Sequence, residues 1–306
     1  RLDRPAMVRG VQDRAERPTG IPIKTPLTHA VELGEGRLAA GADGAATLVL
    51  SGPGGVRSIE LSDPLAGPLA AWNGQLVAAT AAGQVFSLNP DSGEPVATPF
   101  QPELAPNQRY RWLAPAAVET PAGPGLAVSD GEANIYLLKI VPEPTPHLAL
   151  ATSADVGADP LDSRLAVAGN TVLAATLGGR LARYAIPDLA AGDSIELGAR
   201  AKWGPFAYGD GVRLATEAEE LLWVGSNGTV HWRRALDRGA PRSQPLFDGD
   251  SVLAIVDGGV MRVSLKDGSE TGFAEVGQPV AAGPVRLGER LVVTTPDGAL
   301  LVVNRP

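Results

Sequence analysis

The sequence predicts an all-β fold assembled from seven copies of one unit, and three recurring features predict it. The first is a turn, usually with glycine, between two apolar β-prone runs, which is typical of a β-hairpin. The second is a proline 14 to 16 residues before five of these turns. The third is a polar, glycine-rich turn 6 to 10 residues before the hairpins. Because the three features share one register, they indicate an internal repeat.

The spacing of the hairpin turns identifies the repeat. Successive turns lie 39 to 48 residues apart. A period of about 40–45 residues with four strands per unit is the signature of a β-propeller blade. The sequence therefore predicts a seven-bladed β-propeller of four-stranded antiparallel blades. The turns are centred at Gly44, Gly83, Gly131, Gly179, Glu219, Gly259 and Gly298.

Within each predicted blade the elements follow one order. A polar turn joins inner strand A to strand B, and the hairpin turn joins strand B to strand C. A second turn, such as residues 89–94 or 266–270, leads to outer strand D. We expect strand A to begin at the proline, because the first residue of a strand needs no N–H for the ladder. The five prolines are Pro68, Pro115, Pro205, Pro245 and Pro284.

The two ends of the chain are predicted to differ. Residues 1–19 are rich in arginine and acidic residues and are predicted to be a linker or tail, whereas residues 20–306 form a single propeller domain. The chain reaches Pro306 just after the seventh strand C. We therefore expect residues 20–24 to supply the seventh strand D and to pair with residues 300–303. Such closure removes exposed sheet edges, which favour aggregation.

Composition excludes several kinds of chemistry. The 306 residues include no cysteine, which excludes disulfides, thiolate zinc sites, iron–sulfur clusters and cysteine nucleophiles. The net charge of −8 argues against nucleic acid or an anionic membrane as the main partner. No apolar stretch approaches the ~20 residues of a spanning helix, so no membrane span is expected. The compartment stays open between the cytoplasm and the periplasm or cell envelope.

Reactive side chains are sparse and scattered. The three histidines, His29, His147 and His231, fall in different repeats, so each is expected to pack or to face solvent rather than to bind a metal. No Gly-x-Ser-x-Gly elbow or phosphate-binding loop occurs. Aspartates beside glycine in turns are expected to stabilise those turns, with calcium binding as the alternative. The sequence therefore predicts no cofactor, no metal and no enzymatic activity.

Two repeats are longer than the others, and the extra residues supply the candidate binding site. Residues 100–112 and 141–162 are predicted to be insertions joining a strand D to the next strand A. Loops on a rigid scaffold commonly carry recognition, and aromatic and arginine side chains dominate binding energies. In the alternative, Tyr110 and Trp112 pack under the loop while the arginines are solvated. The candidate residues are Arg109, Tyr110, Arg111, Trp112 and Trp203.

Two stretches of the repeat resemble a known family. Residues 68–94, ending in Asp-Ser-Gly-Glu, and residues 283–303, with Pro-Asp-Gly, resemble the pyrroloquinoline-quinone-type propeller repeat, which also occurs in an outer-membrane-assembly lipoprotein. The family's tryptophan after the Gly-Glu turn is missing, and Trp232, after Gly228, is the nearest equivalent. The resemblance implies a bacterial propeller of the non-catalytic type.

These observations favour a scaffold over a catalyst. We expect a module that binds a protein partner, or another domain of its own chain, within a larger bacterial protein. The alternative is a small-ligand sensor, or a quinone- or metal-dependent enzyme, that uses the central funnel. Charged or aromatic side chains converging from several starts of strand A would favour a small ligand, and an apolar rim patch would favour a protein.

Overall fold

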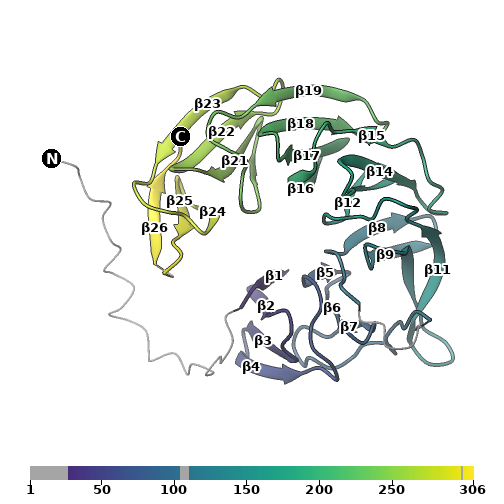
Figure 1. Ribbon diagram of the computed structural model, residues 1–306. Helices are drawn as coiled ribbons and strands as arrows, with labels where there is room; N and C mark the ends of the chain where they lie inside the picture. The colour runs from purple at the N-terminus through teal and green to yellow at the C-terminus, as the bar shows by residue number, and fades with distance from the viewer. Residues whose placement is uncertain (1–26, 104–109, 298) are drawn as a thin grey trace. The chain divides into compact units, whose positions relative to one another are not determined.

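The computed structural model describes residues 27–103, 110–297 and 299–306, which form strands, turns and loops without a helix (Figure 1). Within this part of the chain there is accordingly no helix that could cross a membrane. Contacts divide the described residues into two compact units. The N-terminal unit contains residues 27–178 and Ala182–Asp193, and the C-terminal unit contains Gly179–Leu181 and Ser194–Pro306. The predicted linker, residues 1–19, lies outside the described residues, and the single-domain assignment stays a prediction.

The first four sheets begin in the N-terminal unit, and the last strand of the fourth belongs to the C-terminal unit. Sequential strands are neighbours in every sheet, and the pairings are antiparallel. The first two sheets are β1 (His29–Gly34), β2 (Arg37–Gly41), β3 (Thr47–Gly52) and β4 (Gly55–Glu60), then β5 (Ala70–Trp72), β6 (Gln75–Ala79) and β7 (Val85–Leu88). The next two are β8 (Ala116–Thr120), β9 (Gly123–Ser129), β10 (Asn134–Val141) and β11 (His147–Asp155), then β12 (Ala166–Ala168), β13 (Thr171–Ala175), β14 (Arg180–Ala185) and β15 (Ile195–Glu196).

Three further sheets complete the C-terminal unit. The fifth is β16 (Ala201–Tyr208), β17 (Gly211–Thr216), β18 (Glu220–Gly225) and β19 (Val230–Ala235). The sixth is β20 (Leu246–Asp248), β21 (Ser251–Val256), β22 (Gly259–Ser264) and β23 (Glu270–Glu275). The seventh is β24 (Ala282–Leu287), β25 (Arg290–Thr294) and β26 (Leu300–Asn304). Seven antiparallel sheets confirm the predicted fold class, a seven-bladed β-propeller, and we call the sheets blades one to seven.

Two blades have three named strands. In blade two, isolated bridges join Val85 to Phe100 and Leu88 to Pro95, so residues 95–100 run along β7 in the place of strand D. In blade seven, the predicted strand D is residues 20–24, which lie outside the described residues. Closure by that segment therefore stays a prediction.

Five of the predicted hairpin turns fall between the second and third strands of their blades, and they are centred at Gly44, Gly83, Gly131, Gly179 and Glu219. Gly259 is the first residue of β22, directly after its turn, and Gly298 lies outside the described residues. The prolines follow the prediction less closely. Pro68, Pro115 and Pro245 precede β5, β8 and β20, but Pro205 and Pro284 lie inside β16 and β24. In both strands the register shifts across the proline, and such irregularities accommodate a residue without an N–H.

The second predicted insertion is also corrected. Residues 141–162 were expected to join a strand D to the next strand A. Most of this stretch instead extends the outer hairpin of blade three. Strands β10 and β11 are eight and nine residues long, and they pair from Asn134 with Asp155 to Val141 with His147. The joining loop proper is residues 156–165, between β11 and β12.

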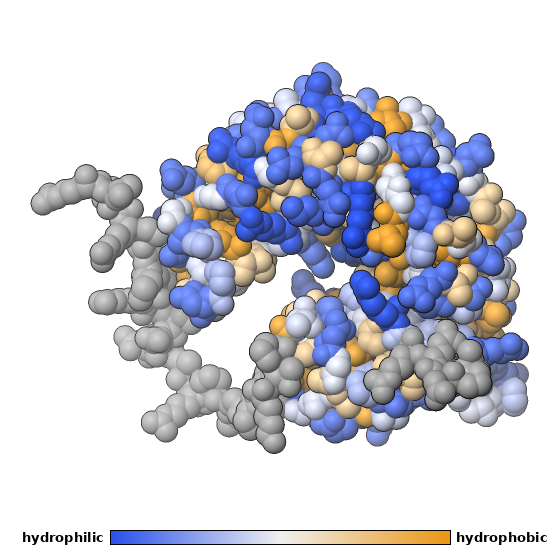
Figure 2. Space-filling model, in the orientation of Figure 1, coloured by the Kyte–Doolittle hydropathy of each residue, from blue (hydrophilic) through white to orange (hydrophobic). Residues whose placement is uncertain are grey.

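The hydrophobic core lies between consecutive blades. One cluster combines Trp72 and Val77 of blade two with Leu126 and Tyr136 of blade three. The clusters bury apolar faces of neighbouring sheets against one another, as stacked repeats require. On the face drawn in Figure 2, hydrophilic residues cover most of the described surface and apolar residues form small separate groups.

Candidate functional site

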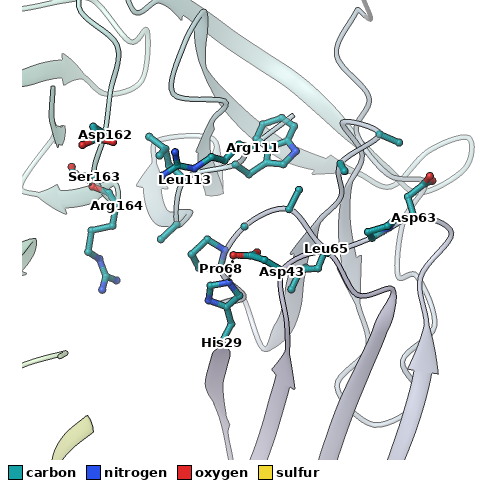
Figure 3. Close-up of a pocket in the computed structure, with 18 residues that line it drawn as sticks. His29, Asp43, Asp63, Leu65, Pro68, Arg111, Leu113, Asp162, Ser163 and Arg164 are labelled. Carbon is teal, nitrogen blue, oxygen red and sulfur yellow. Dashed lines mark hydrogen bonds and ion pairs between the residues drawn. The ribbon is translucent and has the colours of Figure 1, made fainter. Parts of the chain in front are cut away.

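A cavity of about 890 Å³ opens in the N-terminal unit at the edge where the inner strands begin. Blades one to four all contribute to its wall, through the loops before β5, β8 and β12, the turns after β2 and β6, and β1 itself. Figure 3 shows these segments around the opening. We call it the rim pocket, lined by residues 29, 43–44, 63–68, 81–82, 111–114 and 162–164.

Backbone hydrogen bonds join the loops of the rim pocket from blade to blade. Each loop donates an N–H to a carbonyl of the preceding blade, so the wall is held by main chain rather than by mobile side chains. The bonds run from Leu65 N–H to Ala45 C=O (2.8 Å), from Trp112 N–H to Ala66 C=O (2.7 Å) and from Leu165 N–H to Ala114 C=O (3.1 Å). This ladder gives the pocket a preformed shape, which lowers the entropic cost of binding.

One glycine makes the closest of these approaches possible. A Cβ atom at Gly67 would lie 2.5 Å from the carbonyl oxygen of Trp112. Since real Cβ atoms do not approach backbone oxygen so closely, a larger residue would force the loops before β5 and β8 apart. The position of Arg111 at the pocket edge therefore depends on Gly67 in the neighbouring loop.

Charged groups lie around a largely apolar floor that includes Leu65, Pro68 and Leu113. The ionisable residues that line the pocket are His29, Asp43, Asp63, Arg111, Asp162 and Arg164 (Figure 3). His29 Nε2 lies 3.0 Å from Asp43 Oδ2. Burial lowers the pKa of the Arg164 guanidinium below its usual range. A concave apolar surface with a few convergent polar groups is the usual form of a binding site.

Two of the predicted site residues, Arg111 and Trp112, line this pocket, and Arg111 is the exposed one. Its side chain is exposed and makes no hydrogen bond or ion pair with the residues that the structure describes. An exposed guanidinium at the edge of an apolar recess is available to a partner's carboxylate or backbone carbonyl groups. Binding by Arg111 stays a prediction.

Tyr110 and Trp112 take structural positions instead. They are 5% and 2% exposed, and their rings stack at 5.3 Å and 14°. Trp112 Nε1–H donates to the carbonyl of Thr80 at 3.1 Å, and Tyr110 O–H donates to that of Glu103 at 3.1 Å. Buried rings offer no surface to a partner, so the alternative from the sequence, packing beneath the loop, describes these two residues.

Trp203 is also a core residue. It lies in the C-terminal unit, is buried, and packs on Phe206 with ring centres 4.7 Å apart. Its indole N–H donates to the carbonyl of Ser243. The prediction that Trp203 contacts a partner is therefore not carried further. Arg109 lies outside the described residues.

The histidines and turn aspartates have local partners. His147 Nδ1 lies 2.9 Å from the carbonyl of Thr145, and His231 stacks on Trp223. Asp130 Oδ1 accepts three backbone N–H groups from residues 132–134. A hydrogen bond from the Ser269 side chain is the main cause that lowers the pKa of Asp267 to about 2. No group of three potential metal ligands occurs among the described residues.

The sequence signal for most of the pocket was weak. Asp63, Arg111 and Asp162 lie seven, five and four residues before β5, β8 and β12, in the loops that lead to the inner strands of blades two, three and four. A search for charges at that place in the repeat would have found them. Asp43 and His29 carry no such mark, because they come from a different part of blade one.

Comparison with known proteins identifies the fold. No protein-family model matches the chain, and no curated protein matches it. Among solved structures, BamB from Moraxella catarrhalis is 18% identical, covers 91% of this chain and 85% of its own, and has a TM-score of 0.66. BBS1N in complex with ARL6DN is 19% identical, with 92% of both chains covered and a TM-score of 0.66. The chain is thus a β-propeller of the same general type as these two structures.

Proposed function

We propose that this chain is a non-catalytic β-propeller module, with repeats of the pyrroloquinoline-quinone-like type, that binds a protein partner at the rim pocket within a larger bacterial protein. The observation that carries the proposal is Arg111, an exposed charge without a partner among the described residues, at the edge of a preformed apolar recess. Arginine beside a desolvated recess is a frequent centre of binding energy. The surrounding carboxylates of Asp63 and Asp162 set which charges a partner presents.

The structural comparisons support a binding role. BBS1N, which shares the fold over 92% of both chains, was solved in complex with ARL6DN. A propeller suits this task because its loops are fixed by the blades beneath them, so several loops form one composite surface.

The hydroxyl group in the pocket supports a non-catalytic role. Among the described lining residues, Ser163 alone carries a hydroxyl, and both of its hydrogen-bonding functions serve the backbone. Ser163 Oγ accepts the N–H of Ala175 at 2.7 Å and donates to the carbonyl of Arg164 at 3.0 Å. A nucleophilic serine instead needs a neighbouring base within hydrogen-bonding distance.

Reversing the charge of Arg111 tests the proposal. Arg111→Glu should lower recovery of the specific partner at least tenfold in affinity capture from the native host, because the guanidinium contact becomes a repulsion. The matched control is Arg57→Glu, which makes the same change on the exposed outer strand β4. Partner recovery equal in wild type, Arg111→Glu and Arg57→Glu, measured by quantitative mass spectrometry, would contradict the assignment.

A small charged ligand is the second candidate. Charged side chains from the starts of three inner strands converge on the rim pocket, which is the arrangement expected for a ligand-binding funnel. Native mass spectrometry of the protein purified from its host would separate the two candidates. A retained molecule of defined mass that is lost in Arg111→Glu would support the ligand. Bare protein in both samples, together with the capture result above, would support the protein partner.

A further inference from the structure

Strand β17 of blade five carries a buried arginine that lacks an acceptor. Arg213 is 3% exposed, and its Nε and Nη1 atoms have no hydrogen-bond partner among the described residues. Burying an unpaired charge is one of the most costly arrangements in a folded protein. Native structures supply an acceptor from protein, water or ligand for nearly all such groups.

A second unsatisfied donor lies beside the first. Trp223 on β18 is directly opposite Arg213 in the sheet, and the guanidinium carbon lies 4.3 Å from the centre of its indole ring. The indole Nε1 is buried without an acceptor. Trp232, the next tryptophan across the same sheet, differs because its Nε1–H donates to the carbonyl of Leu265 at 3.3 Å. Of these two facing tryptophans, only Trp223 therefore lacks an acceptor among the described residues, and it shares this deficit with the neighbouring Arg213. Thr216 Oγ1 on β17 and Trp72 Nε1 in blade two are further buried groups without a described partner.

The surrounding residues place these donors just beneath the surface. His231 is exposed and stacks on the half-buried Trp223, with ring centres 4.0 Å apart and planes 24° from parallel. Below both rings the sheet has glycines, which carry no side chain. A Cβ atom at Gly211 would lie 2.8 Å from Trp223 Nε1, and one at Gly225 would lie 2.8 Å from His231 Nε2. Two glycines thus make room for a flat aromatic platform at this edge of the blade.

No carboxylate of the described residues forms an ion pair with the buried cation. Asp210, in the turn before β17, raises the pKa of Arg213 from a distance, but no ion pair forms between the two in the part of the chain that is described. Burial is the dominant effect and lowers the pKa of Arg213 to about 10. The guanidinium therefore stays charged at neutral pH without a counterion from the described chain.

We propose that Arg213 and Trp223 form an oxyanion-binding site in blade five. A carboxylate or phosphate oxygen reaches them past His231, accepts hydrogen bonds from the guanidinium and the indole N–H, and neutralises the buried charge. The planar fork of arginine matches both groups, and charge-assisted hydrogen bonds to it are strong. This site is built entirely from C-terminal residues and does not depend on the rim pocket.

Titration calorimetry of the full chain with inorganic phosphate, and separately with succinate, tests the proposal at a constant ionic strength set with chloride. Wild type should bind at least one probe, and the probe that binds better distinguishes a phosphate ligand from a carboxylate ligand. Arg213→Met and Trp223→Phe should each weaken that binding at least tenfold, because each removes donors while keeping an apolar side chain. Trp232→Phe, whose N–H already has an acceptor, should stay within twofold of wild type.

Two results would overturn the site. One is a wild-type protein that binds neither probe, which would leave water as the partner of the buried donors. The other is binding by Trp223→Phe as tight as that of wild type. Trp223→Phe decides the question even where Arg213→Met does not fold, since it keeps the aromatic ring and the buried cation.

Discussion

Buried hydroxyl groups at the ends of the second strands show how single residues hold the repeat. Ser129 is fully buried, and its Oγ donates to the carbonyl of Asn134 at 2.7 Å while accepting the N–H of Gly131 at 3.0 Å. It thereby closes the turn between β9 and β10. Thr216 ends β17 at the corresponding place and is equally buried, but its hydroxyl has no partner among the described residues. The same position is thus satisfied in one blade and unsatisfied in another.

This contrast predicts opposite outcomes for two similar deletions. Ser129→Ala should lower the free energy of unfolding by about 1–3 kcal/mol, because two backbone groups lose a buried partner. Thr216→Val removes a hydroxyl that bonds to nothing and keeps its volume, so it should change stability by less than about 0.5 kcal/mol or increase it. Urea denaturation of both variants measures the difference. Equal losses would show that the hydroxyls do not act through these hydrogen bonds.

At the scale of elements, side chains of an outer strand pack against the turn before the outer strand of the next blade. The ring of Trp232 and the side chain of Arg234, both on β19, cover Gly268, where a Cβ atom would lie 2.7 Å from each. In the first two blades, Ile59 on β4 covers Gly93 in the same way, at 2.5 Å. Both glycines have positive φ, +74° and +73°, and lie in the Asp/Ser/Gly/Glu turns that the sequence marks as the entrance to strand D. The turn motif therefore serves packing between blades.

A double-mutant cycle tests this packing. Gly268→Ala should destabilise wild type both through its positive φ and through the clash with Trp232. In a Trp232→Ala background the contribution from the ring is gone, so the same change should cost about 1 kcal/mol less. Chemical denaturation of the four proteins gives the coupling energy. A cost for Gly268→Ala that is independent of Trp232 would remove the indole from the explanation.

The elements were predictable from the sequence where their causes are local. A glycine turn between β-prone runs forms a hairpin wherever it occurs, so the spacing of the turns gave the blades. The long hairpin of β10 and β11 was mistaken for an insertion between blades because the greater length of the repeat does not show where its extra residues lie, and Pro142, Pro144 and Pro146 occupy only the turn. Pro205 was placed at a strand start because a bulge inside β16 depends on pairing that the local sequence does not show.

The candidate site was predictable only in part, because the residues that form it lie far apart in the sequence. Arg111 was selected because it lies in an insertion rich in arginine and aromatic residues, and it lines the rim pocket, while its role in binding stays a prediction. The neighbouring aromatic residues were mistaken for contact residues, since composition does not distinguish an exposed ring from one that packs under a loop. His29 and Asp162 join Arg111 only because the blades bring separate segments to one edge.

On the scale of the whole molecule, repetition provides both stability and a binding surface. Within the N-terminal unit, blades one to four bury apolar residues against their neighbours, and each of blades two, three and four presents the loop before its inner strand at the rim pocket. The surface is therefore composite: no single blade contains it, and the backbone bonds between loops fix its geometry. Such a composite surface is the means by which the proposed module would recognise a partner without reactive side chains.

Site-specific photo-cross-linking in the native host tests the rim pocket most directly. A benzophenone amino acid replaces Ala81, which lines the pocket, or Val56, which is exposed on the outer strand β4. If the rim pocket is the docking surface, irradiation should join the partner to the protein labelled at position 81 and not to the protein labelled at position 56. Cross-linking from position 56 alone, or with equal yield from both positions, would contradict the account.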